Sequence, residues 1–159
     1  MRHFILILAS FWFLSISGDA SSEASSKIPP LISASGEGDS QRVRYLLDTL
    51  SVDVNELSPD GETALHVAAI KGDPETVQVL LSHGAVVDAV SPGGAQRKMT
   101  PLHWATYGGH EEMVKILLQH GADPHLKDET GLAAVDMAVE SGHDNILQII
   151  EAWLSRGDL

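Results

Sequence analysis

Thr63-Ala-Leu-His-Val-Ala-Ala-Ile-Lys-Gly72 returns later in the chain as Thr100-Pro-Leu-His-Trp-Ala-Thr-Tyr-Gly-Gly109. Each copy is followed by a second shared phrase, Leu-Leu-x-His-Gly-Ala, at Leu80–Ala85 and Leu117–Ala122. Self-similarity at a fixed period indicates that a chain is built from stacked supersecondary units. The two phrases therefore predict repeated units that pack against one another.

The period is set by the glycines that we expect to close the first helix of each unit: Gly38, Gly72, Gly109 and Gly142. Their spacings are 34, 37 and 33 residues (72 − 38, 109 − 72 and 142 − 109). This predicts four repeats. One extra residue is expected within 48–55 and four within 91–99, both in loops, where insertions in repeat proteins occur.

With its Thr-x-Leu-His-x-Ala phrase and its period, the chain resembles the ankyrin repeat family. The resemblance implies an all-α fold, an ankyrin repeat solenoid of stacked helix-turn-helix units joined by β-hairpin loops. We place the repeat domain at 29–153, with repeats at about 29–57, 58–90, 91–127 and 128–153. Residues 154–159 are then a short C-terminal tail.

The repeated residues also have structural roles that require no ligand. Thr63 and Thr100 suit the N-cap of a helix, and His66 or His103 stands at N3, where it can bond back to the threonine as in a capping box. Gly72 is one of the glycines that can adopt positive φ and end a helix. Apolar residues then recur at helical spacing, at Val77, Leu80 and Leu81 and at Val114, Leu117 and Leu118.

The outer repeats depart from the shared phrase. The first, at 29–36, lacks the threonine and the histidine, and the fourth has Ala133-Ala-Val-Asp136 in their place. Glu151 stands where Leu81 and Leu118 predict an apolar residue. Since terminal repeats carry a polar outer face, we expect the stack to finish near Trp153.

The first 20 residues have the features of a secretory signal peptide. A charged start is followed by an apolar run over 4–16 and by Gly18-Asp-Ala20, which favours cleavage after Ala20. Ser15-Ile-Ser17 offers an earlier site. Residues 21–28 are expected to be a polar spacer. The protein is therefore predicted to be secreted or to lie in the endomembrane lumen, with no stable membrane span; an uncleaved signal anchor is the alternative.

The composition restricts the partners. The net charge is −12, and cleavage after Ala20 leaves it unchanged because it removes one Arg and one Asp. Binding to nucleic acid requires clustered Lys and Arg, so nucleic acid is not an expected partner. The chain has no cysteine, which excludes disulfides and a thiolate nucleophile.

Eight histidines raise the question of a metal site. Six of them fall at corresponding points of different repeats, so they are separated by whole repeats. His110-Glu111 is not followed by the second histidine that a zinc protease helix needs. We expect no enzyme activity, catalytic residue, metal, cofactor or small-molecule substrate; a histidine-based metal-binding protein is a remote alternative.

The resemblance implies a protein-binding module that uses a concave surface made of loop tips and the ends of the first helices. The alternative is a structural or regulatory subunit of a larger assembly. Tyr107 is the expected anchor, since aromatic residues dominate interface hot spots. Trp104 either packs in the core or leaves an edge exposed. The candidate partner-binding residues are Asp60, Glu62, Ile70, Lys71, Lys98, Met99, Trp104, Tyr107, Glu129, Leu132 and Glu140.

Overall fold

A computed structural model describes residues 28–91 and 98–156. These residues contain eight α-helices in four consecutive pairs: α3 (Pro30–Glu37) with α4 (Ser40–Leu50), α5 (Ala64–Lys71) with α6 (Pro74–Ser82), α7 (Pro101–Tyr107) with α8 (Glu111–Gln119), and α9 (Ala134–Ser141) with α10 (Asp144–Leu154). The predicted leader, all but the last residue of the predicted spacer, and residues 157–159 lie outside the described part.

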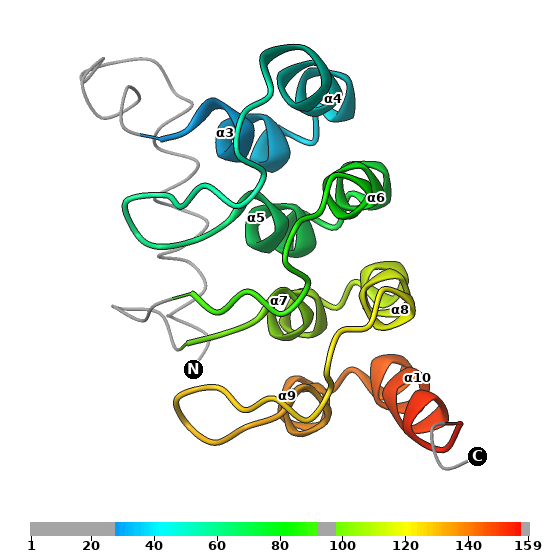
Figure 1. Cartoon of the computed structure of the whole chain (residues 1–159). Helices are drawn as coiled ribbons and strands as arrows, with labels where there is room; N and C mark the ends of the chain where they lie inside the picture. Colours follow the sequence, from blue (N-terminus) through cyan, green and yellow to red (C-terminus); the bar gives the residue numbers. More distant parts are fainter. Residues whose placement is uncertain (1–27, 92–97, 157–159) are drawn as a thin grey trace.

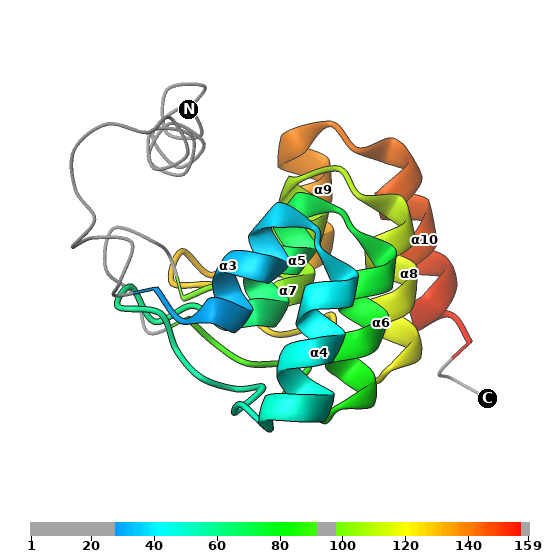
Figure 2. The ribbon, with the colours of Figure 1, turned by 90° about the horizontal axis from the view of Figure 1, so that it is seen from above.

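The helices form two layers (Figure 1). The first helices of the pairs, α3, α5, α7 and α9, pack on one another in order, and α4, α6, α8 and α10 do the same beside them. The loops between pairs project to one side of the first layer, as the view from above shows (Figure 2). The described part is thus a solenoid with an inner layer of helices, an outer layer and a row of loops.

The capping predicted for the repeated phrase is confirmed. The Thr63 hydroxyl accepts from the backbone N–H of His66, and the His66 ring accepts from the backbone N–H of Thr63, so that both orphan donors are satisfied. Thr100 and His103 form the same box at the start of α7. Gly72, after α5, has φ +77°, a left-handed conformation that glycine adopts without steric cost.

The apolar stripes of the outer helices lie in the core. Val77, Leu80, Val114 and Leu117 are fully buried. α6 begins at Pro74 after Asp73, and α8 begins at Glu111 after His110. The helical spacing of these residues therefore identified the seam along which neighbouring pairs pack.

The loops between pairs reverse the chain without forming strands in the described residues, where Lys127 and Ala133 form an isolated β-bridge. Each loop is closed by one backbone bond, from Ser58 N to Glu62 O, Ser91 N to Met99 O and Asp128 N to Leu132 O. The middle closure spans eight residues and the other two span four. This difference places the predicted four-residue insertion between Ser91 and Met99.

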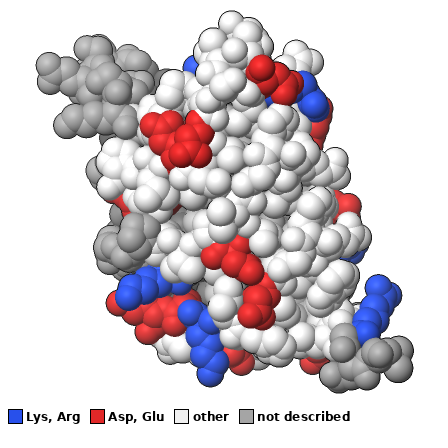
Figure 3. All heavy atoms as spheres, viewed as in Figure 1, with Lys and Arg blue, Asp and Glu red and all other residues white. Residues whose placement is uncertain are grey.

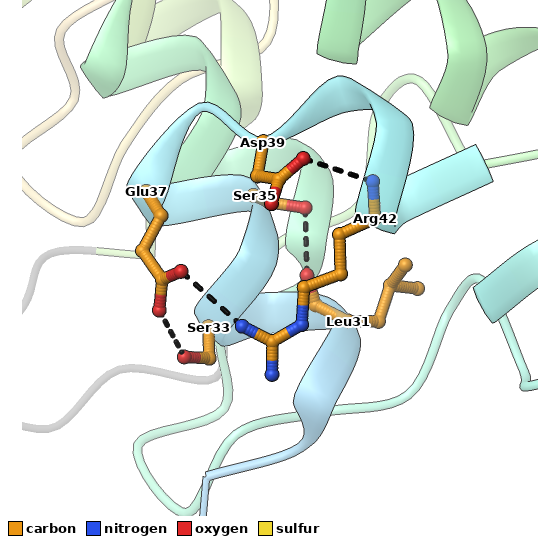
Figure 4. A network of polar contacts seen from close by, with 6 residues as sticks. All are labelled: Leu31, Ser33, Ser35, Glu37, Asp39 and Arg42. Carbon is orange, nitrogen blue, oxygen red and sulfur yellow. Dashed lines mark hydrogen bonds and ion pairs between the residues drawn. The ribbon is translucent and has the colours of Figure 1, made fainter. Parts of the chain in front are cut away.

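The first helix pair carries an exposed polar network (Figure 4). The Ser33 hydroxyl donates to Glu37, whose other carboxylate oxygen lies 3.2 Å from the Arg42 guanidinium. The backbone N–H of Arg42 donates to the Asp39 carboxylate at the start of α4. In the absence of the threonine and histidine box, polar side chains of this pair bond to one another.

Candidate functional site

The candidate site is the surface formed by the loop tips and by the C-terminal ends of α5, α7 and α9, here called the concave surface. The structure places most of the sequence-predicted residues on it with exposed or partly exposed side chains. The exposed ones are Asp60, Lys71, Lys98, Glu129 and Glu140, and the half-buried ones are Glu62, Ile70, Met99, Tyr107 and Leu132.

Trp104 differs from the other predicted residues because it is buried, with 7% of its surface exposed. Its ring meets the His66 ring edge-on, with centroids 6.2 Å apart and planes at 76°. Its indole N–H has no hydrogen-bond partner among the described residues. Of the two interpretations of Trp104, the structure favours core packing, and the side chain offers little area to a partner.

The loop tips are held by side chains at their bases. The Ser58 hydroxyl accepts from the backbone N–H groups of Asp60 and Glu62. Asp128 does the same for Thr130 and Leu132. Burial opposes ionisation of Asp128, but the bonds from Thr130 and Leu132 outweigh it and lower the pKa of this carboxyl. Local bonds therefore hold the backbone at Asp60, Glu62, Thr130 and Leu132.

The two capping histidines also connect consecutive helix pairs. The His66 Nε2 atom lies 3.0 Å from the carbonyl oxygen of Met99, and the His103 Nε2 atom lies 3.2 Å from that of Leu132. Because Nδ1 accepts in the capping box, Nε2 carries the proton and donates. Burial lowers the pKa of His66 to about 4, against the opposing effect of the bond to Met99, so the ring is neutral at pH 7. Burial lowers the pKa of His103 as well.

His110 and His143 make a second set of connections between pairs. The His110 Nε2 atom lies 2.8 Å from the carbonyl oxygen of Ile70, and the His143 Nε2 atom lies 3.3 Å from that of Tyr107. Each of these histidines follows the glycine turn of its own pair and bonds to the pair before it. These bonds fix the backbone at two candidate partner-binding positions.

The polar loops on the far side of the stack are joined in the same way. The Asn55 carboxamide accepts from Val86 N and donates to Gly84 O, and the Asp88 carboxylate accepts from Asp123 N. Asn55 and Asp88 occupy equivalent positions in their repeats, three residues before Ser58 and Ser91. Asn55 therefore joins the first of these loops to the second, and Asp88 joins the second to the third.

The charges on the concave surface are mostly acidic and are unevenly distributed. Burial raises the pKa of Glu62, and the neighbouring carboxylate of Asp60 adds to the effect. Lys98, Lys127 and Glu129 bring both signs to the two later loops. Figure 3 shows the face that carries the connections from the outer helices to the loops; there, basic groups gather beside acidic ones over the lower loops, and a separate acidic patch lies higher.

Sequence reasoning missed two apolar residues at the edge of this surface. Leu57 and Val90 are more than half exposed and stand at equivalent points, each just before the serine that closes its loop. Lys127 occupies the third such position, before Asp128. The signal was available in the sequence, because these residues share one position of the repeat.

The described residues contain no cluster of three or more His, Asp or Glu side chains that could hold a metal ion. Six histidines instead have hydrogen-bond partners of their own. Within the described ranges, no helix has the length and apolar character needed to cross a membrane. The apolar run at 4–16 lies outside them.

A two-layer stack of helix pairs with projecting loops and inter-pair side-chain bonds defines a helical repeat scaffold. A family model described as ankyrin repeats in many copies matches residues 65–118 and 102–152. A second, described as three ankyrin copies, matches residues 8–91 and so begins inside the predicted leader. The chain belongs to the ankyrin repeat family. Repeats of this family are typically non-catalytic and generally mediate protein–protein interactions.

Individual relatives share only this part of their length with the chain. Palmitoyltransferase AKR1 of Yarrowia lipolytica is 38% identical over 71 residues, 45% of this chain and 10% of that protein. Palmitoyltransferase akr1 of Schizosaccharomyces pombe is 46% identical over 111 residues, 70% of this chain and 17% of that protein. Inversin of Danio rerio is 39% identical over 56 residues, 35% of this chain and 6% of that protein. The chain spans less than a fifth of each.

Proposed function

We propose that this protein is a non-catalytic adaptor that binds another protein through the concave surface. The observation that supports this most directly is the way the surface is held. The carbonyls of Ile70 and Tyr107 are bonded by histidines of the next helix pair, and those of Met99 and Leu132 by histidines of the preceding one. A surface fixed before binding loses less conformational entropy when a partner docks.

The side chains on this fixed backbone suit a protein partner. Tyr107 is the anchor we propose, with Ile70 beside it on the end of the preceding inner helix. Leu57 and Val90 add apolar area at the loop edge. Asp60, one of several exposed carboxylates among the candidate residues, would belong to the polar rim that is usual in protein interfaces.

The alternative is that the stack docks permanently inside a larger assembly as a structural or regulatory subunit. Both functions would use the same surface, so the surface alone does not separate them. Sedimentation of the purified protein does: a soluble monomer supports the adaptor, whereas obligatory association supports the subunit.

The compartment belongs to the same proposal. The apolar run at 4–16 and Gly18-Asp-Ala20 support secretion or delivery to the endomembrane lumen, with a mature protein that begins near Ser21. Intact-mass analysis of the secreted protein tests this. Recovery of the chain in a membrane fraction with residues 1–20 still attached contradicts cleavage and supports the signal anchor.

The binding surface is tested with a partner recovered by affinity purification from the native compartment. Tyr107→Ala is expected to weaken binding by at least about 1 kcal/mol, because truncation of an aromatic hot spot has this effect, and to leave the unfolding midpoint almost unchanged. Gln148→Ala, on the exposed side of α10, is the matched control and is expected to have little effect on affinity. A larger loss with Gln148→Ala than with Tyr107→Ala contradicts the proposed surface.

A further inference from the structure

The outer layer of helices carries a groove that is separate from the concave surface. It lies between the C-terminal halves of α8 and α10 and has a volume of about 240 Å³. Its floor is apolar and is formed by Leu118, Ile149, Ala152 and Trp153. Lys115 and Arg156 stand at its edges. All six residues belong to the outer helices or to the turn that follows α10, whereas the concave surface consists of loops and inner helix ends.

The groove arises because the last helix pair ends differently from the two before it. α6 and α8 stop before His83 and His120, and each histidine is followed by a glycine with positive φ. Trp153 stands at the equivalent position of α10, which continues to Leu154. Trp153 therefore lies within the longer helix, where its side chain lines the groove.

α8 and α10, the two helices that form the groove, are also joined at their N-terminal ends. The Asn145 carboxamide donates to the Glu111 carboxylate over 2.7 Å, which joins the first turns of α8 and α10. Ile150 and Leu117 are fully buried in the core beneath the two helices. The groove is therefore a feature of packed helices and does not depend on a loop.

The chemistry of the groove is unusual for this chain. The net charge is −12 with only ten Lys and Arg residues, yet two of these flank one apolar floor. Lys115 has a carboxylate neighbour, Glu112, at 3.6 Å, but both side chains are largely exposed. Exposed ion pairs of this kind are weak, and the ammonium group keeps donors for another partner. Tryptophan and arginine, both present here, are the residues most enriched in binding hot spots.

We propose that this groove is a second docking site, which takes one large apolar side chain from an acidic segment of a partner protein. The volume is below the range of about 300–1,000 Å³ typical of small-molecule pockets, so an inserted side chain fits better than a whole ligand. Carboxylates on either side of the apolar anchor would face Lys115 and Arg156. The complementary charges would speed association and select against basic segments.

The test is a selection of random 12-residue peptides displayed on phage against the full chain. Enriched peptides are expected to combine Asp or Glu with Leu, Phe or Trp. Their affinity is expected to fall at least tenfold for the double variant Lys115→Gln with Arg156→Gln. The matched control is Arg42→Gln with Arg44→Gln, which removes the same charge from exposed sites on α4 and is expected to change affinity less than twofold.

The position of the bound peptide is read from the indole N–H signals of the tryptophans in a nitrogen-15 correlation spectrum, with Trp153 assigned by Trp153→Phe. The Trp153 signal is expected to move on titration and the Trp104 signal to stay in place. The inference is overturned if no acidic and apolar peptide depends on Lys115 and Arg156, or if the Trp153 signal does not move. Peptides lost with Tyr107→Ala instead also overturn it, but they support the proposed concave surface.

Discussion

The stack has two inner helix pairs, α5/α6 and α7/α8, each of which lies between two other pairs. Val79 and Ile116, in these inner pairs, are 4% exposed. Tyr45, at the same position of the terminal pair α3/α4, is 55% exposed. The terminal pair α9/α10, at the opposite end of the stack, shows the same difference in exposure at another position of the repeat. Ala69 and Thr106 are fully buried, but the equivalent Val139 in α9 is 62% exposed. Burial in this stack therefore depends on a neighbouring pair as much as on the pair itself.

The two kinds of pair are also held differently. In the inner pairs, neutral histidines satisfy a cap and reach the next loop, as His66 does with Met99. In the last pair, Asp136 takes the place of that histidine and accepts from the backbone N–H of Ala133, with an exposed side chain. Asp136 thus makes the bond within its own helix turn, whereas His66 makes that bond and a second one to the next helix pair. Nearest-neighbour terms of this kind are what stabilise repeat proteins.

The largest expected effect is the loss of stability when Gly72 is replaced by alanine, compared with the same change at Gly142, which has a similar backbone conformation. Gly72 and Gly142 have φ of +77° and +72°, but a Cβ at Gly72 would lie 2.5 Å from His110 Nδ1, whereas nothing lies within 4 Å of one at Gly142. Gly72→Ala is expected to cost about 3 kcal/mol, because His110 is displaced from the Ile70 carbonyl in addition to the strain at positive φ. Gly142→Ala is expected to cost about 1 kcal/mol, the strain alone.

Urea unfolding followed by circular dichroism measures both variants. Equal costs at the two glycines would mean that His110 moves aside freely, and that its bond to the Ile70 carbonyl contributes nothing to the inner pairs. The contrast between inner and outer pairs would then rest on apolar burial and on the bonds made by His66 and His103.

Acid is expected to weaken the inner pairs through His66. Its folded pKa is about 4, below the usual value of 6.5, so the unfolded chain binds more protons between these limits and stability falls as the pH falls. The contribution of the neutral His66 ring to the free energy of unfolding is complete above about pH 6.5 and is lost by pH 4, a change on the order of 3 kcal/mol. His103, whose pKa is also lowered, adds to the effect in the same direction.

His66→Gln isolates this contribution, because glutamine does not titrate. The difference in unfolding free energy between the native chain and His66→Gln is expected to shrink as the pH falls from 7 to 4. His83 acts in the opposite sense: its bonds to the Val79 carbonyl and to Asp48 raise its pKa, so its contribution is lost as the pH rises. A difference that does not change with pH would show that the His66 ring is not held neutral.

The local part of this architecture was accessible from the sequence. Thr63 and His66 are three residues apart, so their capping box follows from the geometry of one helical turn, and the structure confirms it. Gly72 and the apolar spacing of Val77 and Leu80 likewise predict a turn and a buried stripe without knowledge of any neighbour. The concave surface was predicted by family resemblance; its candidate residues other than Trp104 are exposed or half-buried, and their role in binding stays a prediction.

The rest could not be read locally because it joins residues about 30 to 40 positions apart. The bond from His110 to the Ile70 carbonyl depends on how closely two pairs approach, which the sequence does not state. Trp104 was ambiguous for the same reason: whether a large side chain at that position is covered depends on the room left beside His66. Trp153 was taken as the end of the stack, and only the length of α10 reveals it as part of the lining of a groove.

The smallest expected effect lies in the polar network of the first pair. Arg42 is exposed, whereas Met113, at the same position of α8, is fully buried. The Arg42 and Glu37 side chains are 46% and 43% exposed, and ion pairs so open to solvent contribute little. Arg42→Gln is therefore expected to change the unfolding free energy by less than about 0.5 kcal/mol. Met113→Gln, which buries an amide without a partner, should cost several times more.

A cost above about 1 kcal/mol for Arg42→Gln would show that the network in Figure 4 holds the first pair in place. The end of the stack would then be stabilised by its own polar bonds and not only made compatible with water.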